Sequence, residues 1–298
     1  MQKEHLYSEI FHSIQGEGFY TGFPTLWLRL WACNLQCHGF GQKDPTDPKT
    51  YKLPYADLDP SNYNRLEDFP VFEFGCDSSY SWSRKFKDLQ HKGTPKQIYD
   101  RLIECMMKDG PNHHGLVKDN HMCFTGGEPM LKHNQEAIID VMRQFMAESN
   151  VPPSITIETN GTQDLAFDEG FVTMIDDYVD SNNGELFWSV SPKLFTVSGE
   201  KNEKAIKPEV VKNYYDLSKN GQLKFVVNGT KECWKEVEDV IRSFRAIGIN
   251  FPIWIMPVSA TKEGQEEVAG KIATQALKRG YKVSARVHCY LWGNVVGV

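Results

Sequence analysis

Short apolar segments recur along the whole chain, and helical patterns separate them. Seven of these segments are rich in β-branched, aromatic and aliphatic residues, as strands are. They cover residues 25–31, 121–127, 154–161, 186–193, 222–228, 252–258 and 281–292. Strands that alternate with helices usually pair in parallel, because a helical crossover returns the chain to the same edge of the sheet. The sequence therefore predicts an α/β fold with a mainly parallel sheet.

Three of the intervening helices carry recognisable end signals. Thr94 can cap a helix whose first turn begins with Pro95. Asn134 is placed to cap the next helix, and a later helix is followed by Gly248, as helices often are. The apolar face of that later helix, which we expect in the core, consists of Val237, Val240, Ile241 and Phe244.

Residues 38–75 depart from this alternation. They contain five prolines and many turn-forming residues, with no sustained helix or strand period. We interpret them as an insertion in one domain that spans residues 1–298, since a chain of 298 residues with 40% hydrophobic content can bury a full core.

Charge and the N-terminal sequence limit the possible locations and partners. A formal net charge of -6 argues against a chain that coats nucleic acid or membrane surfaces. The opening MQKEHLYSEIFHSIQGEG has no apolar signal core, and no stretch approaches the roughly 20 apolar residues that cross a bilayer. Seven cysteines in such a chain fit a reducing compartment. We expect a cytoplasmic protein without direct nucleic-acid or membrane partners.

Polar and glycine-rich residues follow four of the predicted strands. The endings are TGGEP at 125–129, ETNGT at 158–162, SPK at 191–193 and MPVSAT at 256–261. A single ending of this kind is more often a tight turn than a ligand loop. However, the carboxyl ends of parallel strands share one edge, so four such endings favour a common pocket.

Two cysteines follow the first predicted strand, at the same expected edge. Cys33 and Cys37 form a C-x3-C pair. Thiolates hold iron–sulfur clusters, whereas structural zinc sites more usually have C-x2-C pairs. The spacing alone leaves a metal site and two ordinary buried thiols equally open.

The motifs as a set resemble those of a known family. CNLQC after a strand, followed by a strand that ends in GGEP, resembles the radical S-adenosylmethionine superfamily. The segments EIFHSIQGEGFYTGFPTLWLRLWACNLQC, FTGGEP, ETNGT, SPK and RVHCYLWGN narrow the resemblance to the 7-carboxy-7-deazaguanine synthase family, over most of the chain. The resemblance implies a partial (β/α)6 barrel, a [4Fe–4S] cluster, S-adenosylmethionine and Mg²⁺.

The third cysteine of the family's cluster motif lies far downstream here. The family has it in a CDT-x-Y-x-W pattern, and the matching text is CDSSYSW at 76–82. The resemblance therefore implies that Cys33, Cys37 and Cys76 bind the cluster in a C-x3-C-x38-C arrangement. Loop-closure entropy grows only slowly with length, so this spacing is tolerable. The remaining cysteines, better explained as small buried residues, are Cys105, Cys123, Cys233 and Cys289.

Two other positions near Cys76 differ from the family pattern. Ser78 replaces a threonine whose hydroxyl the resemblance assigns to Mg²⁺, and serine keeps that oxygen. Gly75 replaces an aromatic residue that packs near the adenine of the cofactor, and Phe40 or Phe74 would take its place.

The resemblance also implies a reaction and its partners. Reductive cleavage of S-adenosylmethionine yields a radical that takes hydrogen from C6 of 6-carboxy-5,6,7,8-tetrahydropterin. The ring contracts, ammonia is lost, and 7-carboxy-7-deazaguanine forms for 7-deazapurine biosynthesis of the queuosine type. An electron donor such as flavodoxin and a homodimer are implied as well.

Site residues follow from the matching positions. Arg29 suits the substrate carboxylate, because a guanidinium binds it in a bidentate fork. The residues implied in catalysis are Glu17 and Arg29. Substrate contacts are implied for Ile14, Gln15, Gly16, Arg29, Thr125 and Val298. Cofactor contacts are implied for Asp77, Gly127, Glu128, Ser191, Pro192, Lys193, Met256, Pro257, Val258 and Ser259.

Two other classes of protein remain open at this point. A glycyl-radical activating enzyme would share the cluster motif, although the SIQGEG segment argues against it. A zinc-binding or interaction protein would use the insertion and keep a vestigial active site. Arg286 and His288 lie in the RVHCYLWGN segment, and a lone histidine such as His288 is more often structural than catalytic.

Overall fold

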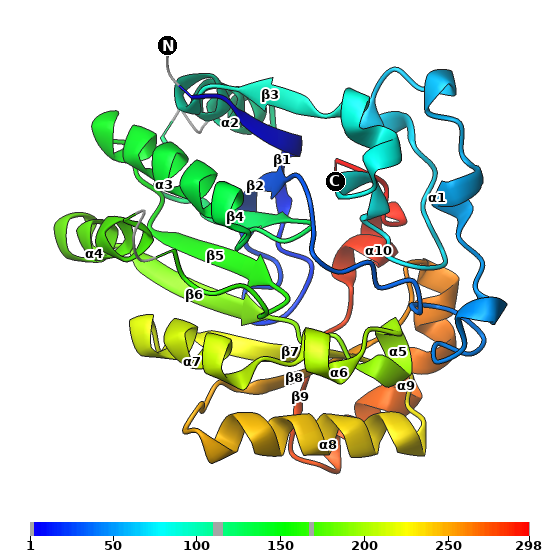
Figure 1. Cartoon of the computed structure of the whole chain (residues 1–298). Helices are drawn as coiled ribbons and strands as arrows, with labels where there is room; N and C mark the ends of the chain where they lie inside the picture. Colours follow the sequence, from blue (N-terminus) through cyan, green and yellow to red (C-terminus); the bar gives the residue numbers. More distant parts are fainter. Residues whose placement is uncertain (1–2, 110–115, 167–169, 298) are drawn as a thin grey trace.

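The computed structural model describes residues 3–109, 116–166 and 170–297, which contain one nine-stranded sheet (Figure 1). The strand order is β3-β1-β2-β4-β5-β6-β7-β8-β9. Neighbours from β2 to β9 pair in parallel, whereas β1 pairs antiparallel with β2 and β3. The strands are β1 (His5–Ile14), β2 (Pro24–Leu30), β3 (His91–Gly93), β4 (His121–Gly126), β5 (Ser154–Thr159), β6 (Glu185–Val190), β7 (Gly221–Val227), β8 (Ile253–Pro257) and β9 (Lys282–Val283). The predicted α/β fold with a mainly parallel sheet is confirmed.

Helices fill the crossovers between the parallel strands and lie outside the sheet (Figure 1). The longer ones are α2 (Pro95–Asp109), α3 (Lys132–Ala147), α4 (Phe171–Asn182), α7 (Pro208–Leu217), α8 (Lys231–Ala246) and α9 (Lys262–Leu277). The short ones are α1 (Pro54–Asp57), α5 (Phe195–Ser198), α6 (Asn202–Ala205) and α10 (Val287–Trp292). None of the helices in the described ranges is long and apolar enough to span a bilayer.

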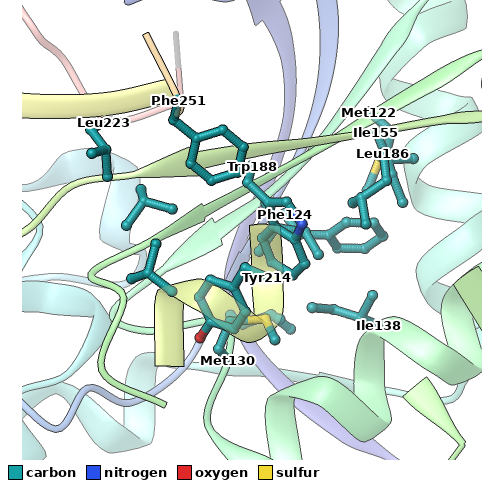
Figure 2. Close-up of a cluster of buried hydrophobic side chains, with 14 of the residues drawn as sticks. Met122, Phe124, Met130, Ile138, Ile155, Leu186, Trp188, Tyr214, Leu223 and Phe251 are labelled. Carbon is teal, nitrogen blue, oxygen red and sulfur yellow. The ribbon is translucent and has the colours of Figure 1, made fainter. Parts of the chain in front are cut away.

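Apolar side chains of the strands and helices form one large core (Figure 2). Phe124 from β4 and Trp188 from β6 lie at its centre, and the Trp188 ring stacks on Tyr214 of α7 with centroids 4.4 Å apart. Parallel strands are covered on both faces, which makes them read as continuous apolar runs. All but the last residue of β4 are buried, and this burial on both faces explains the apolar run of β4 in the sequence.

The structure corrects the prediction at the two ends of the sheet. Strands β1 and β3 were not anticipated, because polar residues interrupt the first and the second has three residues. The strand predicted over 281–292 was wrong: only Lys282–Val283 pair, and α10 follows. The partner strand β8 ends at Pro257, which has no N–H to extend the ladder. The chain therefore turns away from the sheet.

Two of the three predicted helix ends agree with the structure. The Thr94 hydroxyl accepts a hydrogen bond from Gln97 N, and the Gln97 side chain accepts one from Thr94 N. Gly248 follows the last turn of α8 with a φ of +82°. The prediction for Asn134 was wrong. α3 begins two residues earlier, and the Asn134 side chain donates instead to the carbonyls of Trp31 and Glu128.

Residues 38–75 contain α1 and three short 3-10 helices, with no strand of the sheet. The two ends of this insertion meet, because Gly75 N donates to the carbonyl of Phe40 at 2.8 Å. Just beyond the insertion, Ser81 accepts a hydrogen bond on its carbonyl from Ala32 N, at the end of β2. The chain thus leaves the sheet edge after Cys37 and returns to the same place at Cys76.

Candidate active site

A cavity of about 270 Å³ lies at the carboxyl edge of the parallel strands. The residues predicted for the site that line this cavity are Ile14, Gln15, Gly16, Glu17, Arg29, Cys33, Cys37, Cys76, Asp77, Ser78, Thr125, Gly127, Ser191, Lys193, Met256, Pro257, Val258 and Ser259. Glu128 and Pro192 do not line it. Val298 lies outside the described residues, although Gly297 before it does line the cavity.

Three cysteine thiols share one end of the cavity. Cys33, Cys37 and Cys76 line it together, and none of the three forms a disulfide. Burial raises the pKa of the Cys33 thiol to about 12 and also raises the pKa of the Cys37 and Cys76 thiols. A positively charged metal centre offsets this cost, since it binds the thiolate form. The donor set therefore fits a metal group.

The residue type of these three ligands bears on the kind of group that fits. Cysteine thiolates are the ligands that hold iron–sulfur clusters. The competing cysteines Cys105, Cys123, Cys233 and Cys289 do not line the cavity.

Main-chain contacts hold the cysteine loop. The Glu200 carboxylate accepts hydrogen bonds from Gln36 N at 2.7 Å and from Cys37 N at 2.9 Å. Beside the loop, a Cβ on Gly127 would overlap the carbonyl oxygen of Ala32, so only glycine lets the strand end approach this closely. Close packing of the backbone at the cavity wall thus explains why Gly126 and Gly127 follow each other there.

Glu128 has a different position from the one predicted. Its side chain is fully buried, and Thr159 Oγ1 and Met130 N donate to one carboxylate oxygen. Asn160 N donates to the other oxygen at 2.7 Å. The carboxylate therefore joins the turn after β4 to the end of β5 and does not reach the cavity.

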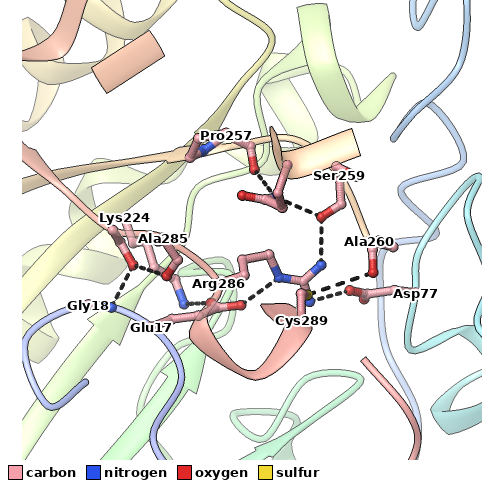
Figure 3. Close-up of polar contacts among 12 residues, drawn as sticks. Glu17, Gly18, Asp77, Lys224, Pro257, Ser259, Ala260, Ala285, Arg286 and Cys289 are labelled. Atoms are coloured by element: carbon pink, nitrogen blue, oxygen red, sulfur yellow. Dashed lines mark hydrogen bonds and ion pairs between the residues drawn. The ribbon is translucent and has the colours of Figure 1, made fainter. Parts of the chain in front are cut away.

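Charged side chains that line the cavity form a continuous network (Figure 3). Arg286 donates to Glu17 at 2.9 Å, to Asp77 at 2.6 Å and to the carbonyl of Ser259 at 2.9 Å. Lys224 forms a second ion pair with Glu17. Burial opposes the charge on Glu17, but Lys224 and Arg286 hold its pKa well below its ordinary value. Glu17 is thus an ionised acceptor at neutral pH.

Arg29 is held by partners on one side. Its Nε donates to Glu9, and its Nη1 lies 3.5 Å from the Ser78 hydroxyl. Tyr80 also donates to the same Glu9 oxygen, at 2.8 Å. Burial acts against the charge on Arg29, but Tyr80 and Glu9 raise the pKa of the guanidinium. Arg29 thus places a charged guanidinium at the cavity wall, where it can bind an anion.

The side chains of Thr125 and Gln15 both donate hydrogen bonds to Glu158, the acidic residue of β5. The Thr125 hydroxyl donates to one Glu158 oxygen at 3.0 Å, and the Gln15 amide donates to the other at 3.3 Å. Lys224 Nζ lies 3.8 Å from the Gln15-bound oxygen. The Thr125 oxygen is consequently oriented to accept a hydrogen bond from a ligand.

Curated proteins of one name are similar to this chain over nearly its full length. Proteins named 7-carboxy-7-deazaguanine synthase from Pyrobaculum aerophilum and Thermoplasma acidophilum are 25% and 24% identical, over 97% and 98% of this chain. The alignments cover 95% and 100% of those relatives. A third protein of that name, from Rhodopirellula baltica, is 24% identical over 97% of this chain and 87% of its own. Over nearly its whole length the chain is therefore similar to proteins named 7-carboxy-7-deazaguanine synthase.

One solved structure and the family models complete the comparison. QueE from Escherichia coli superposes with a TM-score of 0.50 and 17% identity, over 96% of this chain and 95% of that chain, which supports the fold. No protein-family model matches the chain.

Sequence reasoning missed several cavity residues of this 7-carboxy-7-deazaguanine synthase homologue. Glu9 escaped because β1 was not anticipated. Lys224 carried a usable signal, since a lysine inside the apolar run QLKFVVN needs a partner if the strand is buried. Glu158 was visible in ETNGT, but its two hydrogen bonds were not. Arg286 and His288 both line the cavity, although a structural role was expected for His288.

Proposed function

We propose that this chain catalyses the ring contraction of 6-carboxy-5,6,7,8-tetrahydropterin to 7-carboxy-7-deazaguanine, with loss of ammonia. One observation carries the proposal. The thiols of the C-x3-C-x38-C pattern line the same cavity as Glu17, Arg29 and Thr125, to which the resemblance gives catalytic or substrate-binding roles. A radical source and a carboxylate-bearing substrate would thus meet in one enclosed space.

The chain's own side chains assign places to the cofactors. Cys33, Cys37 and Cys76 would hold the [4Fe–4S] cluster, and the Ser78 hydroxyl would bind Mg²⁺. The cluster and S-adenosylmethionine, when bound, supply the radical that begins the reaction. The residues that would hold S-adenosylmethionine all line the cavity and are Asp77, Gly127, Ser191, Lys193, Met256, Pro257, Val258 and Ser259.

Substrate recognition follows from charges and lone pairs. The terminal nitrogens of Arg29 would bind the substrate carboxylate in a fork, because Glu9 already holds Nε. Glu17 is ionised between Lys224 and Arg286, so it can only accept, and it would bind N–H groups on the pterin edge. The remaining substrate contacts in this proposal are Ile14, Gln15, Gly16 and Thr125.

The proposal includes finer expectations for the fold, the partners and the location. We expect the strands from β2 to β8 to form the partial (β/α)6 barrel of radical S-adenosylmethionine enzymes. An electron donor such as flavodoxin would reduce the cluster in the cytoplasm. A homodimer would cover the exposed apolar side chains near the C-terminus, which are Tyr290, Leu291, Trp292 and Val295.

Anaerobic turnover tests the function directly. The reconstituted protein is incubated with 6-carboxytetrahydropterin, S-adenosylmethionine, Mg²⁺ and a reductant, and we expect 7-carboxy-7-deazaguanine and deoxyadenosine to accumulate together. Deoxyadenosine without that product would keep the superfamily chemistry and reject this substrate. A protein that binds zinc but no iron under the same reconstitution would reject the enzyme proposal altogether.

A further inference from the structure

The insertion and the C-terminal residues share one apolar cluster that is separate from the main core. We call this cluster the insertion core; its buried members are Leu66, Phe69, Phe72, Tyr80 and Phe86. Val296, near the C-terminus, packs against it. In Figure 1 the light-blue insertion lies on the side to which the parallel strands point, and the red C-terminal segment lies between it and the sheet.

The same two segments form a wall of the active-site cavity. Residues 70–73 of the insertion and residues 294–297 near the C-terminus both line it. Phe72 connects the two environments, because it is 1% exposed within the insertion core and also lines the cavity. Val296 likewise packs against the insertion core and lines the cavity. The packing of the insertion core therefore decides where the C-terminal wall stands.

Tyr80 connects the insertion core to Arg29. Its ring packs in the insertion core, and its hydroxyl donates to the Glu9 oxygen that also accepts from Arg29 Nε. The Arg29 guanidinium carbon lies 5.8 Å from the centre of the Tyr80 ring. One carboxylate oxygen is thus fixed from two directions, and the guanidinium is oriented by it. Movement of the insertion core would be transmitted to the anion-binding end of Arg29.

We propose that the insertion is a substrate-binding element of this enzyme. Residues 70–73 form part of the substrate wall, the buried Phe72 ring anchors this wall in the insertion core, and the insertion core fixes the C-terminal residues beside it. Tyr80 is a positioning residue, which acts on the substrate carboxylate through Glu9 and Arg29. The inference rests on the proposed function and gives residues 38–75 a part in it.

Two matched substitutions separate this role from a purely structural one. Phe72→Ala and Phe145→Ala each truncate a fully buried phenylalanine, but Phe145 lies in the main core and does not line the cavity. In anaerobic steady-state kinetics we expect Phe72→Ala to raise KM for the carboxypterin by about ten-fold or more, because the cavity wall that its ring anchors would be displaced. Iron content and kcat should stay near the wild-type values. Phe145→Ala should leave KM unchanged.

A conservative change guards against misfolding of Phe72→Ala. Tyr80→Phe keeps the ring in the insertion core and removes only the hydroxyl that binds Glu9. We expect a higher KM for the carboxypterin, with unchanged cluster absorbance and unchanged substrate-independent cleavage of S-adenosylmethionine. A merely structural role for Tyr80 would leave KM as it is.

A truncation tests the link to the C-terminus. A chain that ends at residue 293 should have a raised KM, and Phe72→Ala should add less to KM in that chain than in the full chain, because one wall is already lost. Wild-type turnover together with unchanged KM in Phe72→Ala and Tyr80→Phe would overturn this inference alone. Absence of turnover in the wild type would reject the proposed function and the inference with it.

Discussion

Replacement of Arg286 by methionine removes the cation that joins three parts of the active site. Arg286 links Glu17 in the loop after β1, Asp77 beside the third cysteine, and the carbonyl of Ser259 after β8 (Figure 3). The Arg286 side chain is 11% exposed and the Glu17 side chain 14%. Methionine has a similar length and no charge, so the change leaves two carboxylates without their shared partner.

The expected loss of stability follows from the burial of these groups. Removal of one member of a buried ion pair costs about 3–5 kcal/mol, because the other charge stays buried without compensation. Glu17 keeps Lys224, and Asp77 is 31% exposed and keeps the Ser78 hydroxyl. We therefore expect the lower end of this range at pH 7.5, about 3 kcal/mol.

The loss should depend on pH in a defined direction. Burial opposes the charge on Glu17 and Asp77, but Arg286 contributes to holding the pKa of both carboxyls below the ordinary values. A carboxyl with a lowered folded pKa stabilises the fold above its ordinary pKa, and this contribution is lost as the pH falls through the folded value. In Arg286→Met both pKa values rise. The stability deficit should therefore be largest near neutral pH and shrink as the carboxyls become protonated.

Urea unfolding of the reconstituted protein under anaerobic conditions measures this effect. Wild type, Arg286→Met and the charge-preserving control Arg286→Lys are compared at pH 7.5 and at pH 4, which is near the ordinary pKa of both carboxyls. The lysine variant should keep more of the stability, although it cannot donate to three partners in a fork. A deficit at pH 7.5 below about 1 kcal/mol, the value of an exposed ion pair, would refute the reasoning. A deficit that does not change with pH would refute it as well.

Three further predictions address the cluster, the cofactor wall and a remote histidine. Cys76→Ala should lose the cluster in iron and absorbance measurements while Cys105→Ala keeps it; the reverse result would show that the third ligand was chosen wrongly. Gly127→Ala should abolish turnover, since its Cβ would overlap the Ala32 carbonyl, and wild-type rates would contradict the assigned close approach. Burial lowers the pKa of His121 to about 4, so its neutral form stabilises the fold above the ordinary value of 6.5, and this contribution falls as the pH drops toward 4. Between pH 7.5 and pH 5 the wild type should lose about 2 kcal/mol more than His121→Gln in urea unfolding, and parallel pH profiles would exclude the shift.

The parallel strands and the edge that carries the site could be predicted from local patterns. The sequence of β4 contains an apolar run because both faces of the strand are covered. The residues at its end are polar or glycine because they line the cavity. β9 could not be predicted in the same way. The length of that strand depends on a proline in its partner, Pro257, which is distant in the sequence.

The residues of the site could likewise be predicted only in part. The resemblance placed Cys33, Cys37 and Cys76, and the structure brings these three thiols to one cavity. Glu128 has the residue type expected of a ligand, yet its carboxylate is consumed by hydrogen bonds to β5 and to the following turn. A sequence shows that a carboxylate is present, but the partners that satisfy it are set by chain segments that meet only on folding.

Local periodicity and side-chain chemistry specify the α/β class, the shared edge of strand ends and the residue types that can bind metal and carboxylate, because neighbouring residues suffice to express these properties. Three other features arise only when the chain folds: Arg286 joins Glu17 to Asp77, Tyr80 orients Arg29 through Glu9, and Val296 packs against the insertion core. These contacts join segments that are distant in the sequence, so their pairing depends on how the whole chain packs.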